Sequence, residues 1–299
     1  MVFLRLGGIL TIVKKLRLWY NDRKRNYFWE VLTMNITKLD ENLYRTTIPY
    51  KDIFTTIYAM KAPQGVILFD AASYDSDVDE YIVPFLQELG ITAEELKYVF
   101  ISHNHTDHAG GLKRLLEIYP DVCVLSRSPK LREAYADYHT TRHEDGEIFL
   151  DTFQVVTIPG HTKDCAALLD LRTKTLVSGD CLQSYGIRGS GTWAANISYP
   201  DLHVAAVEKV SKLDIERIVT AHDYDPHGYR ADGKEAVKAN LEACITPLRR
   251  MQQLIVQYPE LDDKALQAKY NYDPQLPKIK DTVIGAMRLA MEEGRIEKL

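Results

Sequence analysis

Hydrophobic positions along the chain follow two different periods, and the changes between them predict the order of strands and helices. Short apolar runs at 43–48, 54–60 and 66–69 are divided by turn residues such as Pro49 and Gly65, which is typical of consecutive strands. From 77 to 89 the apolar residues instead recur at helical spacing, and Gly90 ends the pattern. The chain therefore opens its ordered part with strands followed by a helix.

The same mixture continues as far as residue 220, and the pattern then changes. The apolar spacing predicts strands at 98–101, 122–125, 153–158, 166–171, 175–178 and 217–220, and helices at 112–118, 129–138 and 202–213. Beyond about Gly233, apolar residues recur every three or four positions from 237 to 255, and helical segments follow at 266–269 and 279–294. Two mixed α/β halves with a helical C-terminal tail suit a layered αββα sandwich.

The first 33 residues differ in charge from the rest of the chain. They carry seven basic and two acidic residues, a net of +5, so the remainder holds −10 of the total charge of −5. An apolar stretch at 6–13 precedes most of the basic residues, which is the reverse of a signal peptide. Two interpretations stay open, a basic amphipathic helix on a membrane surface or a simple extension. We predict an extension at 1–33, a catalytic domain at 34–232 beginning with Met34, and a helical region at 233–299.

Composition narrows the classes of function and of partner. An acidic catalytic body repels phosphates, so we expect a small-molecule substrate and no nucleic acid. The four cysteines show no paired spacing and are expected to be free thiols, which fits a cytoplasmic protein. No apolar run approaches the roughly 18–20 residues that span a bilayer, so we expect no stable membrane insertion.

The residues from His103 to His108 carry the strongest chemical signal. His103, His105, Asp107 and His108 follow directly after the predicted strand at 98–101. Three imidazoles and a carboxylate in six residues are costly to bury unless a cation holds them. Imidazole and carboxylate suit Zn²⁺, and with a different bias iron or manganese. This run therefore predicts a metal site where the chain leaves the sheet.

Three more candidate ligands lie after later strands. His161 follows Pro159-Gly160, Asp180 follows Gly179, and His222 follows Ala221. Each comes near the end of a predicted strand, where loops gather at one edge of a sheet. His139, His143 and His203 have no such company and are expected at the protein surface, while Cys181 beside Asp180 is expected to pack in the interior. His227 is expected either to line the pocket or to lie at the surface.

The run His-x-His-x-Asp-His-x-Gly-Gly, followed by Pro-Gly-His, Gly-Asp and a last His, resembles the metallo-β-lactamase superfamily. The resemblance implies an αβ/βα four-layer sandwich with two metals, expected to be zinc, at one edge. By matching position, His103, His105 and His161 would bind the first metal, Asp107, His108 and His222 the second, and Asp180 would bridge them. Asp70 matches a residue that supports the site in relatives, although its usual Asp-Thr-Gly is Asp70-Ala71-Ala72 here.

Two metals sharing a water lower its pKa toward about 7 and so provide hydroxide as the nucleophile. The ligand set resembles the branch that holds glyoxalase II-type thioesterases and lactonases, which implies cleavage of a thioester or lactone. Asp107 is predicted to orient the hydroxide as well as bind metal, and Tyr185 to donate to the substrate carbonyl. A mononuclear-iron persulfide dioxygenase and a β-lactamase remain the alternatives.

Overall fold

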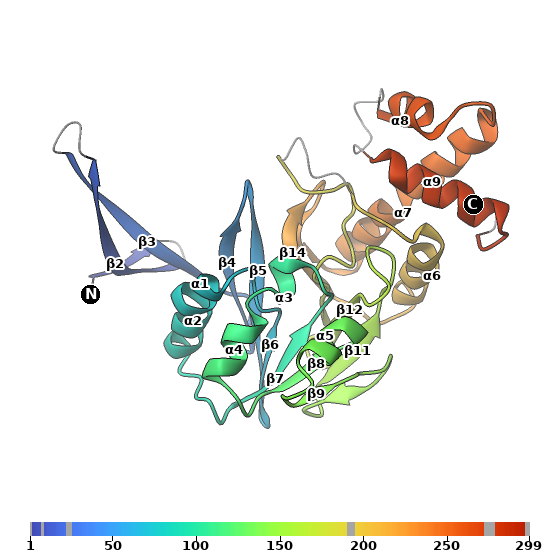
Figure 1. Ribbon diagram of the computed structural model, residues 1–299. Coiled ribbons are helices and arrows are strands. Elements are labelled where there is room, and N and C mark those ends of the chain that lie inside the picture. Colours follow the sequence, from blue (N-terminus) through green and yellow to red (C-terminus); the bar gives the residue numbers. More distant parts are fainter. Residues whose placement is uncertain (1, 7–8, 22–25, 190–194, 272–278, 297–299) are drawn as a thin grey trace.

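The computed structural model describes residues 2–6, 9–21, 26–189, 195–271 and 279–296, with side chains from residue 35 onward. Two β-sheets lie side by side in the middle of the molecule, and helices cover their outer faces (Figure 1). The predicted four-layer αβ/βα arrangement with C-terminal helices is confirmed.

The first sheet contains strands β1 to β9 in the order of the sequence. Neighbours are antiparallel from β1 to β6 and parallel from β6 to β9. The chain changes to parallel pairing where helices begin to connect the strands, because a parallel neighbour needs a crossover. The strands are β1 (Val2–Leu6), β2 (Ile9–Asn21), β3 (Asn26–Lys38), β4 (Leu43–Tyr50), β5 (Ile53–Ala62), β6 (Gly65–Phe69), β7 (Leu96–Ile101), β8 (Cys123–Ser126) and β9 (Thr140–Thr141).

The second sheet contains strands β10 to β15, again in sequence order. All its pairs are antiparallel except β13 with β14, which the helix α6 (Pro200–Val210) connects. The strands are β10 (Ile148–Phe149), β11 (Phe153–Thr157), β12 (Ala166–Asp170), β13 (Thr175–Val177), β14 (Arg217–Tyr224) and β15 (Gly228–Asp232).

Apolar side chains from the two sheets meet in a shared core. Phe69 and Phe100 of the first sheet stack with ring centroids 5.2 Å apart, and both belong to one buried cluster with Phe153 and Val219 of the second sheet. The Tyr58 hydroxyl crosses between the sheets and donates to the Thr220 carbonyl at 2.6 Å. Burial of these large side chains is the main force that holds the sheets together.

Helices close the outer face of each sheet with separate apolar clusters. A helical segment and α4 cover the first sheet, whereas α6 and α7 cover the second. The helical segment comprises α1 (Asp75–Asp77), a π-helical turn (Val78–Ile82) and α2 (Val83–Glu88). Helix α4 spans Leu112–Ile118 and α7 spans Lys234–Gln257, and a further short helix, α5 (Pro129–Ala134), follows β8. Pro84 cannot donate to the carbonyl of Glu80, and the helix widens into the π turn just before it.

The C-terminal helices α8 (Asp263–Asn271) and α9 (Asp281–Glu292) share an apolar cluster with α6 and α7. The helical region predicted from Gly233 begins one residue later as α7, but this helix also covers the second sheet. Among the described helices, none combines the length and the apolar character needed to cross a membrane.

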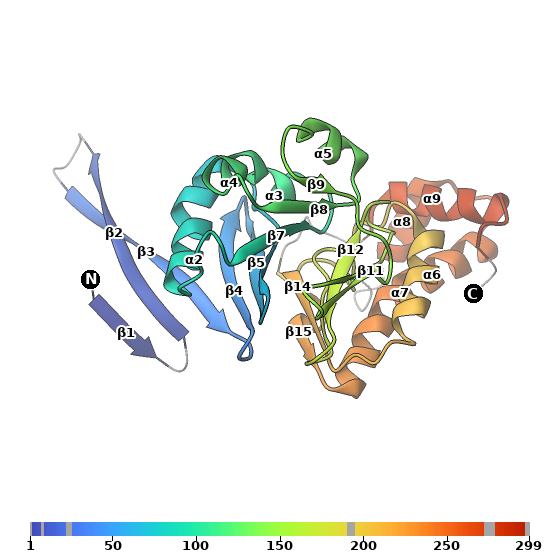
Figure 2. The ribbon, with the colours of Figure 1, turned by 90° about the horizontal axis from the view of Figure 1, so that it is seen from below.

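The secondary structure of the N-terminal segment contradicts one of the two interpretations of its sequence, the amphipathic helix. Its described residues form the strands β1, β2 and β3, so the amphipathic helix considered for this segment is wrong. The long β2–β3 hairpin extends away from the rest of the molecule in both views (Figures 1 and 2). β3 runs through Met34 and pairs with β4 only from Ile36 to Lys38, so a strand crosses the predicted domain start.

Candidate metal centre

The seven predicted ligands come together from both sheets at one edge of the sandwich. Four lie in or beside the short helix α3 (Thr106–Ala109) that follows β7, a helix that the sequence pattern did not reveal. The other three follow β11 and β13 or lie in β14. Their ligand atoms form three groups within which all atoms are less than 4.8 Å apart, namely His103, His105 and His161; His103, His108 and Asp180; and Asp107, His108 and His222.

In the first group, three imidazole nitrogens point at one another. Nδ1 of His105 lies 3.0 Å from Nε2 of His103 and 2.9 Å from Nε2 of His161. His161 donates from Nδ1 to the Asn196 carbonyl at 2.6 Å, which leaves its Nε2 as a bare lone pair. Burial lowers the pKa of His161 to about 4, so this ring is neutral at physiological pH.

The tautomer of His103 follows from its neighbour Ser102. The Ser102 hydroxyl donates to Oδ2 of Asp70 at 3.0 Å, so it must accept from Nδ1 of His103, which lies 3.1 Å away. Nε2 of His103 is then also a lone pair, and burial lowers the pKa of this ring well below its usual value. The two nitrogen lone pairs converge on a third imidazole, and together the three rings offer a set of ligand atoms that suits a cation.

In the second group, two imidazole nitrogens face carboxylate oxygens. His222 donates from Nδ1 to the Phe54 carbonyl, and its Nε2 lies 3.4 Å from Oδ2 of Asp107 and 3.2 Å from Oδ1 of Asp180. His108 donates from Nδ1 to Asp70 at 2.7 Å, and its Nε2 lies 3.5 Å and 3.4 Å from the same two oxygens.

If both imidazole rings were neutral, these contacts would be repulsive, because the Nε2 lone pair of each ring would face a carboxylate anion. Nε2 of His108 and Oδ1 of Asp180 are buried and have no hydrogen-bond partner in the part of the chain that the structure describes. Burial alone would lower the pKa of His222, but the charge of Asp180 and the hydrogen bonds of both carboxylates raise it to about 9. The group thus needs positive charge between its nitrogens and oxygens, and the residues fit a metal ion.

Asp70 forms hydrogen bonds that orient residues of both groups, as the family resemblance implies. Its Oδ1 accepts from the Ser102 backbone at 2.8 Å, while its Oδ2 accepts from the Ser102 hydroxyl and from His108. Asp70 itself adopts a left-handed backbone with φ of 67°. Nearby, a Cβ on Gly110 would lie 2.1 Å from the Ser73 carbonyl oxygen, so only glycine permits this close passage beside α3.

A pocket of about 230 Å³ opens over the two groups. Five of the predicted ligands form one wall of it. The rest of the lining is Tyr50, Lys51, Ile53, Thr106, Gln183, Ile187, Asn196, Tyr224 and Lys280. Such a concave, partly apolar hollow beside perturbed titratable groups is typical of an active site.

Tyr224 of β14 lines this pocket, whereas Tyr185, which the sequence analysis selects, does not. The Tyr224 hydroxyl is buried beside the Asp180 carboxylate, and the burial and that charge both raise the pKa of the hydroxyl well above its usual value. Tyr185 is half-buried, and its backbone donates to the Asp225 carbonyl at 3.0 Å. Residues two apart in a strand face the same side, so the spacing of His222 and Tyr224 was a signal in the sequence.

Two of the histidines expected at the surface are buried. His143 stacks on Phe100 with ring centroids 4.7 Å apart, and His203 packs against Gly160, which has no side chain to obstruct it. Both rings fill space in the interior, which is why their positions do not follow from local polarity. His139 is exposed, and Cys181 is buried in the apolar cluster of the second sheet as predicted.

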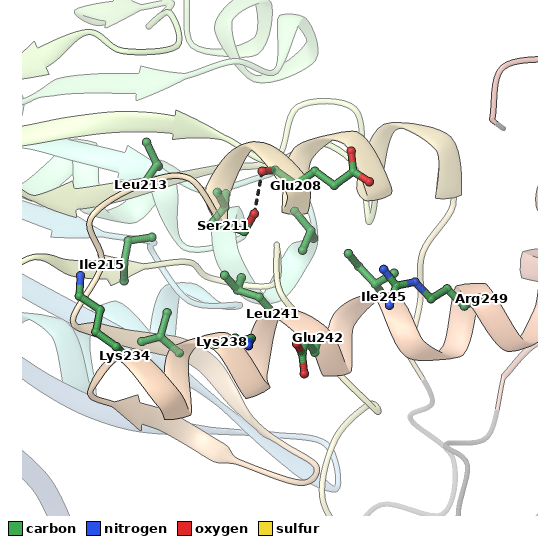
Figure 3. A pocket seen from close by; sticks show the side chains of 13 residues that line it. Glu208, Ser211, Leu213, Ile215, Lys234, Lys238, Leu241, Glu242, Ile245 and Arg249 are labelled. Atoms are coloured by element: carbon green, nitrogen blue, oxygen red, sulfur yellow. Dashed lines mark hydrogen bonds between the residues drawn. The ribbon is translucent and has the colours of Figure 1, made fainter. Parts of the chain in front are cut away.

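A second hollow, of about 420 Å³, lies between α6 and α7 (Figure 3). Apolar side chains such as Leu241 and Ile245 form its floor, and charged side chains such as Lys238 and Glu242 stand at its rim. Among the residues that the structure describes, its lining includes none of the predicted metal ligands.

Comparison with known proteins agrees with this geometry. The chain is 35% identical over 139 residues to a hydroxyacylglutathione hydrolase of Francisella philomiragia, a match that covers 44% of this chain and 50% of the relative. It therefore spans about half the length of that curated relative. A hydroxyacylglutathione hydrolase of Crocosphaera subtropica is 26% identical over 211 residues, covering 70% of this chain and 75% of the relative.

A solved metallo-beta-lactamase family protein from Thermus thermophilus has the same fold. It superposes with a TM-score of 0.59 at 18% identity and covers 86% of this chain and 95% of its own. The sequence model of the metallo-beta-lactamase superfamily matches residues 50–222, which include every predicted ligand. The chain belongs to the metallo-beta-lactamase superfamily.

Proposed function

We propose that this protein is a dinuclear metal-dependent hydrolase of a thioester or lactone in a small organic molecule. The observation that supports it best is that Nε2 of His108 and Nε2 of His222 both face the carboxylate oxygens of Asp107 and Asp180, at 3.2 to 3.5 Å. Two nitrogens and two carboxylates around one point form a ligand set for a second cation, in addition to one at the three-histidine group, and that cation would replace the protons that the carboxylates otherwise hold on the rings.

The residues divide naturally between two ions. His103, His105 and His161 would hold the first, Asp107, His108 and His222 the second, and Asp180 would bridge them, since its two carboxylate oxygens face different groups. Its Oδ2 lies 3.7 Å from His161, whereas its Oδ1 faces His108 and His222. Histidine and carboxylate suit Zn²⁺ best, with iron or manganese as alternatives.

Two such ions, when bound, supply a nucleophile from water at neutral pH and polarise the carbonyl that it attacks. Asp107 stands in the pocket wall, where its carboxylate orients the attacking group and accepts its proton. The Tyr224 hydroxyl, which lines the same pocket, donates to the oxygen that gains charge. No serine or cysteine nucleophile is required.

A substrate panel tests the proposal. Protein reconstituted with zinc is assayed with a thioester, a lactone, an aryl ester and a β-lactam, before and after treatment with a chelator. We expect metal-dependent hydrolysis of the thioester or the lactone to exceed that of the β-lactam. Oxygen consumption with a persulfide by the iron-loaded protein, without hydrolysis of any ester, would overturn the proposal in favour of an oxidoreductase.

A further inference from the structure

Two lysines stand in the pocket without a role in the proposed hydrolysis. Apart from the predicted metal ligands, Lys51 and Lys280 are the only charged side chains among the described residues that line the pocket. Both are exposed, so they lie where the pocket opens to solvent. They come from opposite ends of the chain, Lys51 from the tip of the β4–β5 hairpin and Lys280 from the start of α9.

The hairpin fixes the position of Lys51. Tyr50 and Ile53 are the last paired residues of β4 and β5, so Lys51 and Asp52 form a two-residue turn. Lys51 has the left-handed φ of 53° that such a turn requires. Its ammonium lies 4.8 Å from the centre of the Tyr50 ring, a cation–π contact with a second residue of the pocket.

A different set of contacts fixes Lys280. The preceding residue, Ile279, is 3% exposed and belongs to the apolar cluster of the C-terminal helices. Its backbone donates to the Asn271 side chain at 3.1 Å, and its carbonyl accepts from Gln267 at 2.8 Å. Helix α8 therefore holds the backbone at the point where α9 begins and places Lys280 at the pocket.

The charge balance of the site indicates what the lysines bind. Two divalent ions more than neutralise Asp107 and Asp180, the two carboxylates in the pocket wall, so the wall is positively charged when metal is bound. The chain outside the first 33 residues carries a net charge of −10 and would repel an anion from most of its surface. A cationic opening in an acidic body favours a substrate that brings its own negative charge.

We propose that Lys51 and Lys280 bind a carboxylate of the substrate at the opening of the pocket, so that the hydrolysed ester or thioester is an anionic molecule. This proposal rests on the proposed hydrolase function and adds the class of substrate to it. The lysines are specificity-determining residues, because they touch a part of the substrate remote from the bond that breaks.

Two probes that differ only in one charge test the proposal. In S-acetyl-3-mercaptopropionate two methylene groups separate a free carboxylate from the thioester sulfur, and the methyl ester of this acid is neutral. The released thiol is measured with a chromogenic disulfide. The zinc-loaded parent is compared with Lys51→Gln, Lys280→Gln and the double variant. Lys238→Gln is the control, because this exposed lysine stands at the rim of the other hollow (Figure 3).

We expect each pocket variant to raise KM for the acid by roughly 5- to 10-fold, since the lysines are solvent-exposed and the contact is charge-assisted. KM for the methyl ester should change by less than about twofold and kcat for both probes should stay near the parental value, because a remote group contributes uniform binding. In the parent, raising the salt concentration should raise KM for the acid but not for the methyl ester, and this effect on the acid should be smaller in the double variant.

An equal shift of KM for both probes, or no shift for either, would overturn the lysine proposal while leaving the hydrolase intact. Failure of the proposed function is recognised differently, by the absence in the parent of metal-dependent turnover of both probes and of the lactone in the substrate panel. That result would contradict both proposals together.

Discussion

Nδ1 of His108 lies 2.7 Å from Oδ2 of Asp70, and both side chains are completely buried. This contact fixes the tautomer of His108 and turns Nε2 toward Asp107 and Asp180. The same Asp70 oxygen accepts from the Ser102 hydroxyl, which in turn sets the tautomer of His103. One carboxylate thus prepares a nitrogen in each of the two groups.

Replacing Asp70 by Asn should therefore weaken metal binding without removing a ligand. The amide would place an N–H toward Nδ1–H of His108 or lose the bond to Ser102. We expect the affinity for zinc to fall about 10- to 100-fold, the usual effect of losing such a partner, as measured by competition with a chelator. Asp145→Asn is the matched control, because that carboxylate pairs with Lys209 at the surface. Equal affinity in both variants would show that Asp70 has no part in preparing the site.

Tyr224 and Tyr185 can be compared directly. Tyr224→Phe removes one buried hydroxyl and keeps the ring that packs in the interior, so the free energy of unfolding should change little. Its kcat should fall by about 10²-fold, the lower end of the range for one lost oxyanion donor, because a metal also polarises the carbonyl. Tyr185→Phe should have the smaller effect, since Tyr185 does not line the pocket. A larger loss of kcat in Tyr185→Phe would instead support the catalytic role that the sequence predicts for Tyr185.

The N-terminal segment should be dispensable for catalysis. A protein that begins at Met34 keeps Ile36, Thr37 and Lys38, which are the residues of β3 that pair with β4. We expect it to fold, to bind metal and to keep the parental kcat/KM, as measured with the substrate that the panel identifies. A large loss of folded protein or of activity would show that the β2–β3 hairpin has a partner in the catalytic body.

Asp107 should matter more for the chemical step than for substrate capture. With metal occupancy measured and equal, Asp107→Asn should lower kcat by a factor on the order of 10²–10⁴, the range for acid–base groups. His227→Ala and Cys181→Ala serve as controls and should stay within a few-fold of the parent, because neither residue lines the pocket. A fully metallated Asp107→Asn protein with parental kcat would reduce Asp107 to a structural ligand.

The sequence predicted the central strands and helices because their side chains face buried surfaces, where the apolar period is strong. β5 was predicted at 54–60 and spans Ile53–Ala62, and α4 was predicted at 112–118 and spans the same residues. The convergence of His103, His161 and His222 was predictable because each follows a strand that the sequence pattern predicts, and the ends of such strands gather at one edge of the sandwich.

Other features depend on tertiary packing and left little local trace. Lys280 reaches the pocket only because Gln267 and Asn271 hold the backbone before it, and no local pattern in the sequence encodes that contact. The N-terminal strands were missed because lysines at 14 and 15 interrupt the apolar alternation of β2, at the point where its register with β3 shifts between Val13 and Leu16.

One chain should hold two metal ions that act together. The most direct measurement titrates zinc into metal-free protein and follows bound metal and hydrolysis in the same samples. We predict that activity rises until about two ions are bound per chain, as seven ligands for two open sites imply, and that Asp180→Ala loses metal. Full activity with a single tightly bound ion, or undiminished hydrolysis by metal-free protein, would contradict the account.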